Sequence, residues 1–433
     1  MSRYDDSVVR VIGDSPTFIR RARGFAPLPV ELPVALPRPV LATGPHLKNT
    51  FALAVDRTVF VSQHIGDLEN LETLQHFRSA LARFRELFRI EPRVVVCDEH
   101  PGYLSTRVAE ELALELGEES GPGSTGVPVI RVQHHHAHIA AVAAEHGRTG
   151  PVVGLAFDGT GYGADGHTWG AEVLVADLVR YRRAAHLRYA PMPGGDIAAR
   201  RPWRAALGYR TLAPGSADAF EAAFGEVSRA ELRLVEQQAL RGVNSPLASS
   251  MGRLFDAASA VLGLRADARY EGQAAMELES VAWSVLVGPD KGPLASGEQI
   301  RARAAQIGVP ELPFPDSRSA DGLRVLEPGP LLVALGRAFL GGGHPALLAA
   351  AFHLAVADRA VCTASEVAEQ EGLATVALGG GTFQNALLVP LIRDSLLERG
   401  FEVLIPHLLG PNDGAISYGQ AAVAAGRTIQ QGR

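Results

Sequence analysis

The chain has 433 residues, of which 47% are hydrophobic and 20% are charged, a composition typical of a folded protein with room for more than one domain. Its formal net charge of -6 argues against a nucleic-acid partner, because such partners favour basic surfaces. The two cysteines, Cys97 and Cys362, form no CxxC pair. This excludes a cysteine-rich zinc finger and a disulfide framework, and it fits a reducing cytosol.

No segment of the sequence predicts export or membrane insertion. The first residues lack the apolar stretch of a signal peptide. The most apolar helix-like stretch, 345–357, is short and contains His353, so we expect no membrane span. A cytoplasmic protein is predicted.

Residues 1–39 predict an N-terminal extension and linker rather than the start of a domain. Residues 6–12 form one strand-like segment, whose partner would lie on another chain or on an absent upstream domain. A basic stretch at 20–23 follows, and the prolines between 27 and 39 predict an extended linker.

Residues 40–150 predict a first α/β lobe. Residues 50–55 and 58–62 flank a turn at Asp56 and predict a hairpin. The other elements show apolar residues at helical spacing or in short continuous runs. In chain order we predict strand 40–44, helix 68–88, strand 94–97, helix 105–116, strand 127–132 and helix 134–146.

Residues 151–433 predict a second lobe, which opens with a buried strand at 151–157. The region from about 200 to 290 is mostly helical and predicts an insertion. The chain then alternates again, and we predict strand 375–378, helix 383–399, strand 401–405 and a closing helix at 413–426.

The segment Gln133-His-His-His-Ala-His138 predicts a metal site. His134 and His138 are four residues apart, so a helix beginning after strand 127–132 places both imidazoles on one face. Two neutral imidazoles one turn apart are a suitable pair of metal ligands. The alternative is a surface or tag-like histidine run, but the segment lies inside the strand–helix pattern rather than at a terminus.

Carboxylates elsewhere in the chain can complete such a site. Asp158 follows strand 151–157, and Asp413 follows strand 401–405. Two histidines with one or two carboxylates form a mixed nitrogen and oxygen site that suits Fe, Zn or Mn. Each aspartate also has a simpler explanation, a turn carboxylate for Asp158 and a helix N-cap for Asp413.

Three glycine-rich turns predict a nucleotide site. They are Gly44 to Thr50, which contains Lys48 and Asn49, then Asp158 to Gly163, and Gly379 to Gly381. Backbone N–H groups in such turns can approach a phosphate, although each turn alone is equally well explained as a tight turn. Together they are typical of the bilobal α/β fold shared by acetate kinase, sugar kinases, heat-shock ATPases and actin, where a nucleotide lies between the lobes.

The ordered motifs of the chain also resemble those of one family. They are Gly44-Pro-His-Leu-Lys-Asn-Thr50, Ser62-Gln-His-Ile-Gly-Asp-Leu-Glu-Asn70, Cys97-Asp-Glu-His-Pro-Gly-Tyr-Leu-Ser-Thr106, Val132-Gln-His-His-His-Ala-His138, Asp158-Gly-Thr-Gly-Tyr-Gly163, Pro191-Met-Pro-Gly-Gly-Asp196, Arg201-Pro-Trp203, Ser250-Met-Gly-Arg-Leu-Phe-Asp256, Glu271-Gly-Gln-Ala-Ala-Met-Glu277, Gly379-Gly-Gly-Thr-Phe-Gln-Asn385 and Asn412-Asp-Gly414. From about residue 40 onward the chain resembles the C-terminal half of the HypF-type carbamoyltransferases of nickel–iron hydrogenase maturation. That half is related to the threonylcarbamoyl-transfer family and to antibiotic O-carbamoyltransferases.

The resemblance implies roles for particular residues. A divalent or trivalent metal (Fe, Zn or Mg) would be held by His134, His138, Asp158 and Asp413. The adenylate would be bordered by Glu271, Gly272, Gly379, Gly380, Gly381 and Asn385. The phosphate or carbamoyl end would lie near Lys48, Asn49, Gly195 and Asp196. Catalysis is assigned to Lys48, His135 and Asp158, and His135 and His136 either position the substrate or face away from the metal.

The resemblance also implies the reaction and the partners. A YrdC-like module would use ATP to make carbamoyl adenylate, and this chain would transfer its carbamoyl group to the C-terminal cysteine thiol of HypE. Residues 5–11 resemble the tail of that YrdC-like domain. The alternatives are a threonylcarbamoyl or small-molecule O-carbamoyl transferase, a sugar-kinase-like phosphotransferase, and a non-catalytic nucleotide-binding partner.

Overall fold

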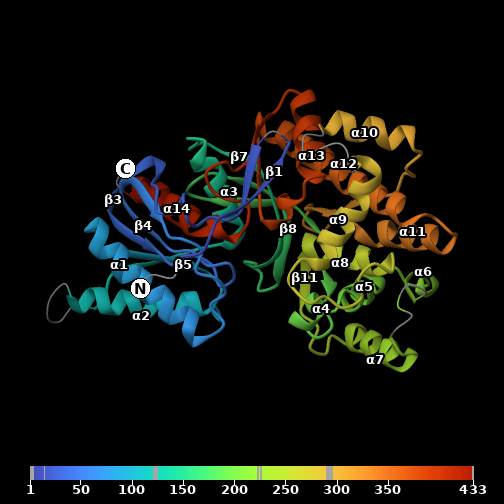
Figure 1. The fold of residues 1–433 in the computed structure, drawn as a ribbon, viewed down its shortest axis with the longest axis horizontal. Helices are drawn as coiled ribbons and strands as arrows, with labels where there is room; N and C mark the ends of the chain where they lie inside the picture. Colours follow the sequence, from blue (N-terminus) through green and yellow to red (C-terminus); the bar gives the residue numbers. More distant parts are fainter. Residues whose placement is uncertain are drawn as a thin grey trace.

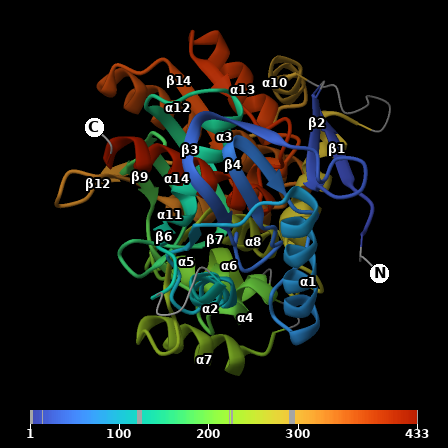
Figure 2. The same ribbon diagram turned by 90° about the vertical axis from the view of Figure 1, so that its left-hand side faces the viewer.

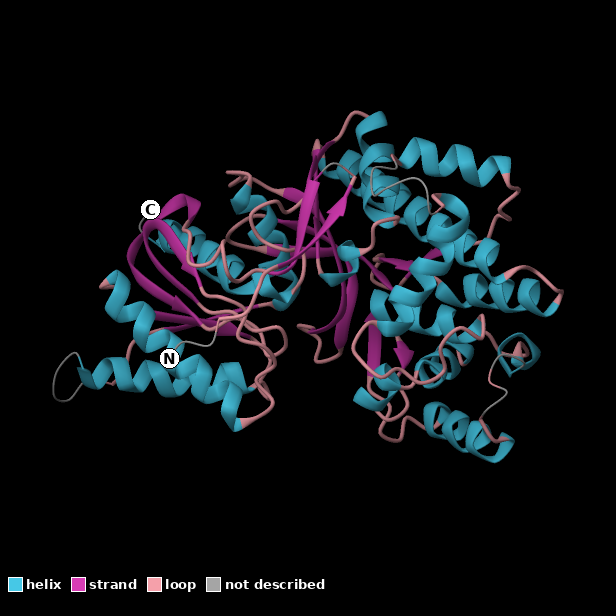
Figure 3. Cartoon of the chain, viewed as in Figure 1, coloured by secondary structure: helices cyan, strands magenta, loops and turns pink. Residues whose placement is uncertain are grey.

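Two β-sheets, one in each lobe, organise the fold (Figure 1). The computed structural model describes residues 4–13, 15–119, 125–221, 224, 227–288 and 296–431. In Figure 1 the first lobe lies at the left, and the helix-rich part of the second lobe lies at the right. Figure 3 shows the same division by secondary structure, with strands in the left and central parts and mainly helices at the right.

The first lobe is a sheet that is covered by helices on both faces. It consists of β3 (Val30–Ala42), β4 (Ala52–Val61), β5 (Val94–Asp98), β6 (Val129–Val132), α1 (Leu71–Phe88), α2 (Leu104–Glu119), α3 (His134–Glu145) and α14 (Ile416–Gln431). Leu41 and Val95 pack with α1 and α2, whereas Val40 and Val94 pack with α3 and α14. The continuous apolar runs in these strands are therefore explained by burial on both faces.

The second lobe contains the larger sheet. Its strands are β7 (Val152–Tyr162), β8 (Thr168–Ala176), β9 (Tyr181–Leu187), β10 (Ala190–Pro191), β11 (Leu247–Ser250), β12 (Asp316–Arg318), β13 (Arg324–Leu326), β14 (Thr375–Gly379) and β15 (Glu402–Leu404). The main strand order is β12-β13-β9-β8-β7-β14-β15.

The two sheets repeat one strand arrangement. In the second lobe β7 pairs antiparallel with β8 on one edge and parallel with β14 on the other, and β15 extends the parallel edge. In the first lobe β3 pairs in the same way with β4 and β5, and β6 extends the parallel edge. The predicted bilobal α/β fold is confirmed by this repeat, which the amino-acid sequence does not reveal.

Helix α3 lies between the two sheets and is buried along almost its whole length. Its alanines pack against α14 and the first sheet, while Ile139 and Val142 pack against β7, β8 and β14. Close approach requires small neighbours: a Cβ on Gly419 of α14 would lie 2.0 Å from the Ala137 carbonyl oxygen, and one on Gly154 of β7 would lie 2.5 Å from Ile139. The histidine segment thus begins the helix that joins the lobes.

The predicted helical insertion is present in the second lobe. Its helices and those that follow are α4 (Asp196–Arg200), α5 (Pro202–Arg210), α6 (Ala217–Glu221), α7 (Arg229–Leu240), α8 (Met251–Val261), α9 (Gln273–Leu286), α10 (Gly297–Gln306), α11 (Pro328–Leu340), α12 (Pro345–Glu371) and α13 (Leu388–Glu398), with the short 3-10 helices η1 (Gly381–Gln384) and η2 (Asp413–Ala415). α12 is twice as long as the predicted stretch 345–357. It is long and apolar enough to cross a membrane, but 72% of its most apolar window is buried inside the protein, where it packs on α9 and α13.

The N-terminal segment differs from the prediction of a lone strand and a linker. β1 (Val8–Ile12) pairs antiparallel with β2 (Ser15–Arg20), so its partner lies in the same chain. Pro16 is tolerated because this hairpin has only two strands, each with a free edge. Residues 30–39 belong to β3, because the alternate residues Val30 and Leu32 are buried in the core of the first lobe.

The predicted hairpin at 50–62 is also wrong. Residues 52–61 form the single strand β4, which pairs along its length with β3. Asp56 has a φ of 52° and lies where the register with β3 shifts. Aspartate tolerates this left-handed conformation, so the polar pair Asp56 and Arg57 marks an irregularity within a strand and not a chain reversal.

The C-terminal helix returns to the first lobe. α14 follows η2 and packs on α3 and β3, as Figure 2 shows with the red helix behind the blue strands. The segment just before it, which carries Asp413, therefore passes from the second sheet back to the first.

Candidate active site

Parallel pairing of β5 and β6 positions the start of α3. β6 ends at Val132, which lies opposite Asp98 at the end of β5. Gln133 is the N-cap of α3, and its side-chain oxygen accepts a hydrogen bond from the His136 N–H at 2.8 Å. His134 and His138 then lie one turn apart on the helix, as predicted.

The second lobe brings two carboxylates to these histidines. Asp158 lies within β7, which continues to Tyr162, so the predicted turn at 158–163 is wrong: the glycines lie in a strand whose register with β8 shifts between Phe157 and Gly161. His134 Nε2 lies 3.5 Å from Asp158 Oδ2 and 3.7 Å from Asp413 Oδ1. His138 Nε2 lies 3.8 Å and 3.6 Å from the same two oxygens. We call these four residues the metal cluster; their four ligand atoms lie within 4.8 Å of one another, and all four residues are buried.

The metal cluster fits a bound cation. Both Nε2 atoms are buried and have no hydrogen-bond partner in the part of the chain that the structure describes, and the nitrogen–oxygen distances are too long for good hydrogen bonds. Two ligands of a tetrahedral ion lie about 3.4 Å apart when each is about 2.1 Å from the ion, close to the spacing here. Two imidazoles and two carboxylates suit Fe, Zn or Mn and do not select among them.

Asp98 orients the first ligand. Its Oδ2 lies 2.9 Å from His134 Nδ1, and its side chain is fully buried. Because a carboxylate oxygen accepts, Nδ1 carries the proton and Nε2 is left as the metal-binding nitrogen. Asp98 was not among the predicted site residues, although its place at the end of the buried strand 94–98, which pairs with the strand before the histidines, was the available signal.

The carboxylates determine the charges of the metal cluster. Burial lowers the pKa of His134, but Asp158, Asp413 and Asp98 outweigh it and raise that pKa well above its usual value. Burial raises the carboxyl pKa values, but the two histidines hold the pKa of Asp158 well below its usual range. They also lower the pKa of Asp413 to about 2, against both its burial and the charge of Asp158. The carboxylates are therefore ionised, which is the state that binds a cation.

Replacing Asp98 by asparagine is expected to weaken Zn²⁺ binding about 10- to 100-fold, because His134 loses the carboxylate that fixes its tautomer and raises its basicity. A competition titration against a chromophoric chelator measures this change. The matched control is Glu99→Gln at the next position, which should bind Zn²⁺ like the unaltered protein. Equal affinities for Asp98→Asn and the control would contradict the assigned role.

The predicted glycine turn at 379–381 supports Asp158. The Gly381 N–H donates to Asp158 Oδ1 at 3.0 Å, which leaves Oδ2 facing the histidines. Gly380 has a φ of 100°, and a Cβ there would lie 2.3 Å from the Phe157 carbonyl oxygen. Only glycine fits this close approach between β7 and η1.

Lys48 and Glu271 connect the two lobes beside the metal cluster. Lys48 Nζ lies 2.6 Å from Glu271 Oε1, and the two side chains are 31% and 57% exposed. Burial opposes the charge on Lys48, but Asp413, Glu271 and Asp158 together raise its pKa. Lys48 is therefore a charged group within the electrostatic field of the metal cluster.

His135 and His136 face different surroundings. His136 Nε2 lies 2.7 Å from the Asp177 carbonyl oxygen and its ring packs near Tyr181, so it points away from the metal cluster. Because Gln133 uses its oxygen for the His136 N–H, its Nε2 donates to His135 Nδ1 at 3.2 Å. His135 therefore carries its proton on Nε2, a buried donor with no hydrogen-bond partner among the described residues.

Other predicted nucleotide residues are less directly connected to the metal cluster. Asn385 Oδ1 accepts hydrogen bonds from the Leu387 and Leu388 N–H groups at the start of α13, and its Nδ2 donates to His353 at 3.1 Å. Asn49 donates to the Thr43 and Pro45 carbonyl oxygens. Gly272 is the N-cap of α9, next to Glu271. Gly195 and Asp196 begin α4, and within the described ranges no hydrogen bond or ion pair joins them to the cluster.

The N-terminal hairpin supports the loop that carries Asp413. Asn412 Nδ2 donates to the Ile19 carbonyl oxygen at 3.0 Å, and Thr50 Oγ1 donates to the Gly414 carbonyl oxygen at 3.0 Å.

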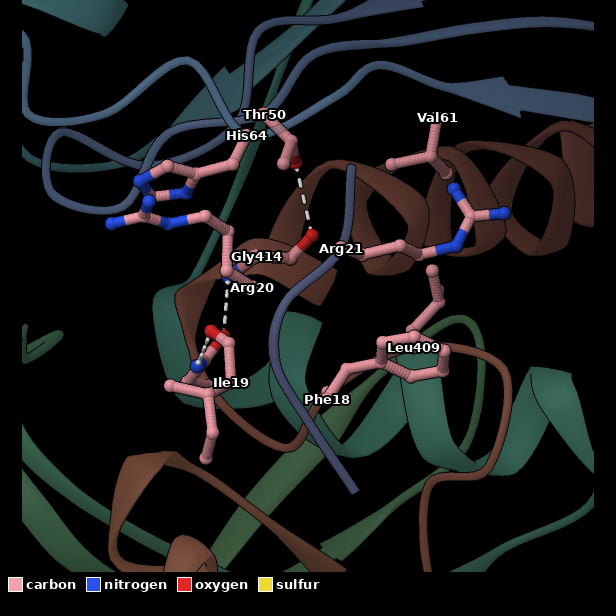
Figure 4. A pocket seen from close by; sticks show the side chains of 11 residues that line it. Phe18, Ile19, Arg20, Arg21, Thr50, Val61, His64, Leu409 and Gly414 are labelled. Carbon is pink, nitrogen blue, oxygen red and sulfur yellow. Dashed lines mark hydrogen bonds between the residues drawn. The ribbon is translucent and has the colours of Figure 1, made fainter. Parts of the chain in front are cut away.

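Figure 4 shows a small cavity beside this loop, lined by β2, β4 and residues 409–414. No residue of the metal cluster lines it, so this cavity is distinct from the metal site.

Comparison with known families identifies the family of this chain. A model described as "Carbamoyltransferase, Kae1-like Domain, second subdomain" matches residues 154–420, and one described as "HypF Kae1-like domain" matches residues 35–145. This chain belongs to the HypF carbamoyltransferase family. The resemblance predicted from the ordered motifs is thus confirmed.

Individual relatives extend the match over nearly the whole chain. Carbamoyltransferase HypF2 of Cupriavidus necator is 41% identical over 98% of this chain, and a shorter HypF homolog of the same organism is 36% identical over 89%. The chain covers 51% of the first relative and 91% of the second.

A crystal structure of full-length HypF in the phosphate- and nucleotide-bound form is 36% identical and superposes with a TM-score of 0.85 over 98% of this chain and 51% of that one. A crystal structure of T. kodakarensis HypF is 33% identical and superposes with a TM-score of 0.83 over 99% of this chain and 53% of that one. The chain thus spans about half the length of most of the HypF proteins it matches.

Proposed function

We propose that this chain transfers a carbamoyl group from carbamoyl adenylate to the C-terminal cysteine thiol of a HypE-type acceptor, in the cytoplasm. The observation that carries the proposal is the metal cluster, in which residues of both lobes meet at the glycine-rich end of β7. Membership of the HypF family supplies the chemistry, and a nucleotide-bound HypF with this fold supports an adenylate ligand.

In this proposal each part of the site has a separate task. The metal cluster would hold Fe or Zn, and a bound cation would polarise the carbamoyl carbonyl group and offset charge that develops on oxygen. Lys48 would bind the leaving phosphate once Glu271 is displaced from it. His135 would donate its Nε2–H to a substrate oxygen. Gly379, Gly380 and Gly381 would border the adenylate, with Glu271, Gly272 and Asn385.

No covalent intermediate on the protein is required, because the adenylate is already a good leaving group. Cys97 is buried, and burial raises the pKa of its thiol to about 12, so it is a poor nucleophile. The YrdC-like module that makes carbamoyl adenylate would be a partner. Asn49, Gly195 and Asp196 remain candidates for contact with the carbamoyl or phosphate end in a closed state.

The test is a single-turnover reaction of the metal-loaded chain with preformed carbamoyl adenylate and purified HypE. Mass spectrometry of the HypE C-terminal peptide should show one added carbamoyl group, and His134→Ala should abolish it. Transfer that persists in His134→Ala would contradict the metal-dependent reaction. Binding of HypE without transfer would instead support the non-catalytic alternative.

A further inference from the structure

Arg253 in α8 lies beside Gly159, in the glycine-rich end of β7, and was not among the predicted site residues. We infer that its guanidinium group binds the phosphate of the nucleotide. This inference rests on the proposed function and assigns to it a phosphate-binding residue. Three observations carry it: how Arg253 is held, what it faces, and the charges around it.

A buried carboxylate holds one edge of the guanidinium group. Arg253 Nε lies 2.8 Å from Asp256 Oδ2, one helical turn further along α8, and the two side chains are 14% and 3% exposed. Within the described part of the chain, the two Nη atoms have no hydrogen bond or ion pair to another residue. A purely structural ion pair would use the Nη groups as well, in the bidentate geometry that arginine favours. Here they are left for a ligand.

The free edge lies at the glycine-rich end of β7. A Cβ on Gly159 would lie 3.9 Å from Arg253 Nη2 and, apart from the neighbouring residues in the chain, would meet no other described atom within 4 Å, so the space at this glycine is otherwise open. The start of α8 is fixed against β7, because Ser250 Oγ donates to the Gly159 carbonyl oxygen at 2.6 Å. Gly252 permits this packing, since a Cβ there would lie 2.8 Å from Gly159 Cα. Arg253 is therefore held at a fixed position relative to this end of β7.

The charges of the site favour a further cation beside the phosphate. Asp158, Asp413 and Asp98 surround the histidines, so an unscreened phosphate approaching the metal cluster meets three carboxylates. Lys48 is paired with Glu271, whose charge also acts on Arg253 and Asp256. The Glu271 carboxylate therefore interacts with both Lys48 and Arg253. An anionic ligand would compete with Glu271 for these two cations. A planar guanidinium group can bind two phosphate oxygens at once.

The test compares AMP with adenosine, which differ only in the phosphate. Isothermal titration calorimetry on the metal-loaded chain should show tighter binding of AMP. The double variant Arg253→Met/Asp256→Asn removes the cation without leaving a buried unpaired carboxylate. It should weaken AMP binding about 10- to 100-fold, the loss expected for charge-assisted hydrogen bonds, and change adenosine binding less than about 2-fold.

Two further variants make the test specific. Arg253→Lys keeps a charge but not the two-pronged geometry, and should recover part of the AMP affinity. Arg265→Met removes another arginine, whose Nη2 lies 2.6 Å from Glu277 Oε1. This variant should bind both ligands normally. An unchanged ratio of AMP to adenosine affinity in the double variant would overturn the inference alone. Failure of the unaltered chain to bind either ligand would overturn the proposed nucleotide site and this inference with it.

Discussion

Replacing His134 by alanine should abolish high-affinity metal binding while the fold is retained. His134 supplies one of only two nitrogen ligands in the metal cluster, and its removal also leaves the buried Asp98 carboxylate without its partner. Outer ligand partners alone change metal affinity about 10- to 100-fold, so loss of a direct ligand should cost at least about 100-fold. Metal analysis after dialysis against chelator, followed by Zn²⁺ titration, measures the change.

Zn²⁺ should also stabilise the unaltered chain against unfolding. A ligand present at 100 times its dissociation constant raises the unfolding free energy by about 2.7 kcal/mol, so the thermal transition should rise with Zn²⁺ concentration. His134→Ala should lose this response. The matched control is His136→Gln two residues further on, because the His136 ring bonds to the Asp177 backbone and not to the metal cluster. Equal losses in the two variants would show that the histidine segment has only a structural role.

The metal cluster was largely predictable from the sequence because its signals are local. His134 and His138 follow from helical spacing, and each aspartate directly follows a predicted strand. Whether all four residues would meet depended on the resemblance and on the fold. Asp98 was missed because its partner His134 lies 36 residues further along the chain, where no spacing rule connects the two. Arg253 was missed because its spacing from Asp256 indicates only a helical ion pair and not that this part of α8 lies beside β7.

The fold was predicted well where apolar patterns were long and poorly where polar residues interrupt strands. Helix α3 begins at its predicted residue, and α1 ends at its predicted one. Residues 30–39 were assigned to a linker because of their prolines, yet alternate side chains in this segment are buried and β4 pairs with it. Asp56 was assigned to a turn, although a strand can accommodate it at a register shift. In both cases tertiary pairing outweighed local preference.

The four residues of the metal cluster come from elements that belong to different parts of the fold. His134 and His138 belong to α3, Asp158 to a strand of the second sheet, and Asp413 to the loop that returns to the first lobe. A cation bound by all four residues would therefore fix α3, β7 and η2 relative to one another. The ion pair between Lys48 and Glu271 adds a second connection, one that an anionic ligand can replace.

Replacing Arg183 by methionine should produce the largest loss of stability away from the metal cluster. Glu172 is fully buried in β8, and Arg183 Nε lies 2.5 Å from its Oε2. Arg183 also stacks on Trp169, with its guanidinium carbon 4.1 Å from the ring centroid. Removing one partner of a buried ion pair leaves an uncompensated charge, which costs about 3–5 kcal/mol. Urea titration followed by circular dichroism measures the change in unfolding free energy.

A double variant separates the contribution of the ion pair to the free energy of unfolding from that of side-chain packing. Arg183→Met/Glu172→Gln removes both charges and keeps an acceptor for Ser249, whose hydroxyl donates to Glu172 Oε1 at 2.7 Å. It should recover much of the loss, since the cost arises chiefly from the unpaired carboxylate. The matched surface control is Arg78→Met, whose side chain is 36% exposed, and it should change stability by at most about 1 kcal/mol. A single-variant loss no larger than that of Arg78→Met would mean that Ser249 and the backbone N–H groups of Gly170 and Ala171 suffice to stabilise the buried carboxylate.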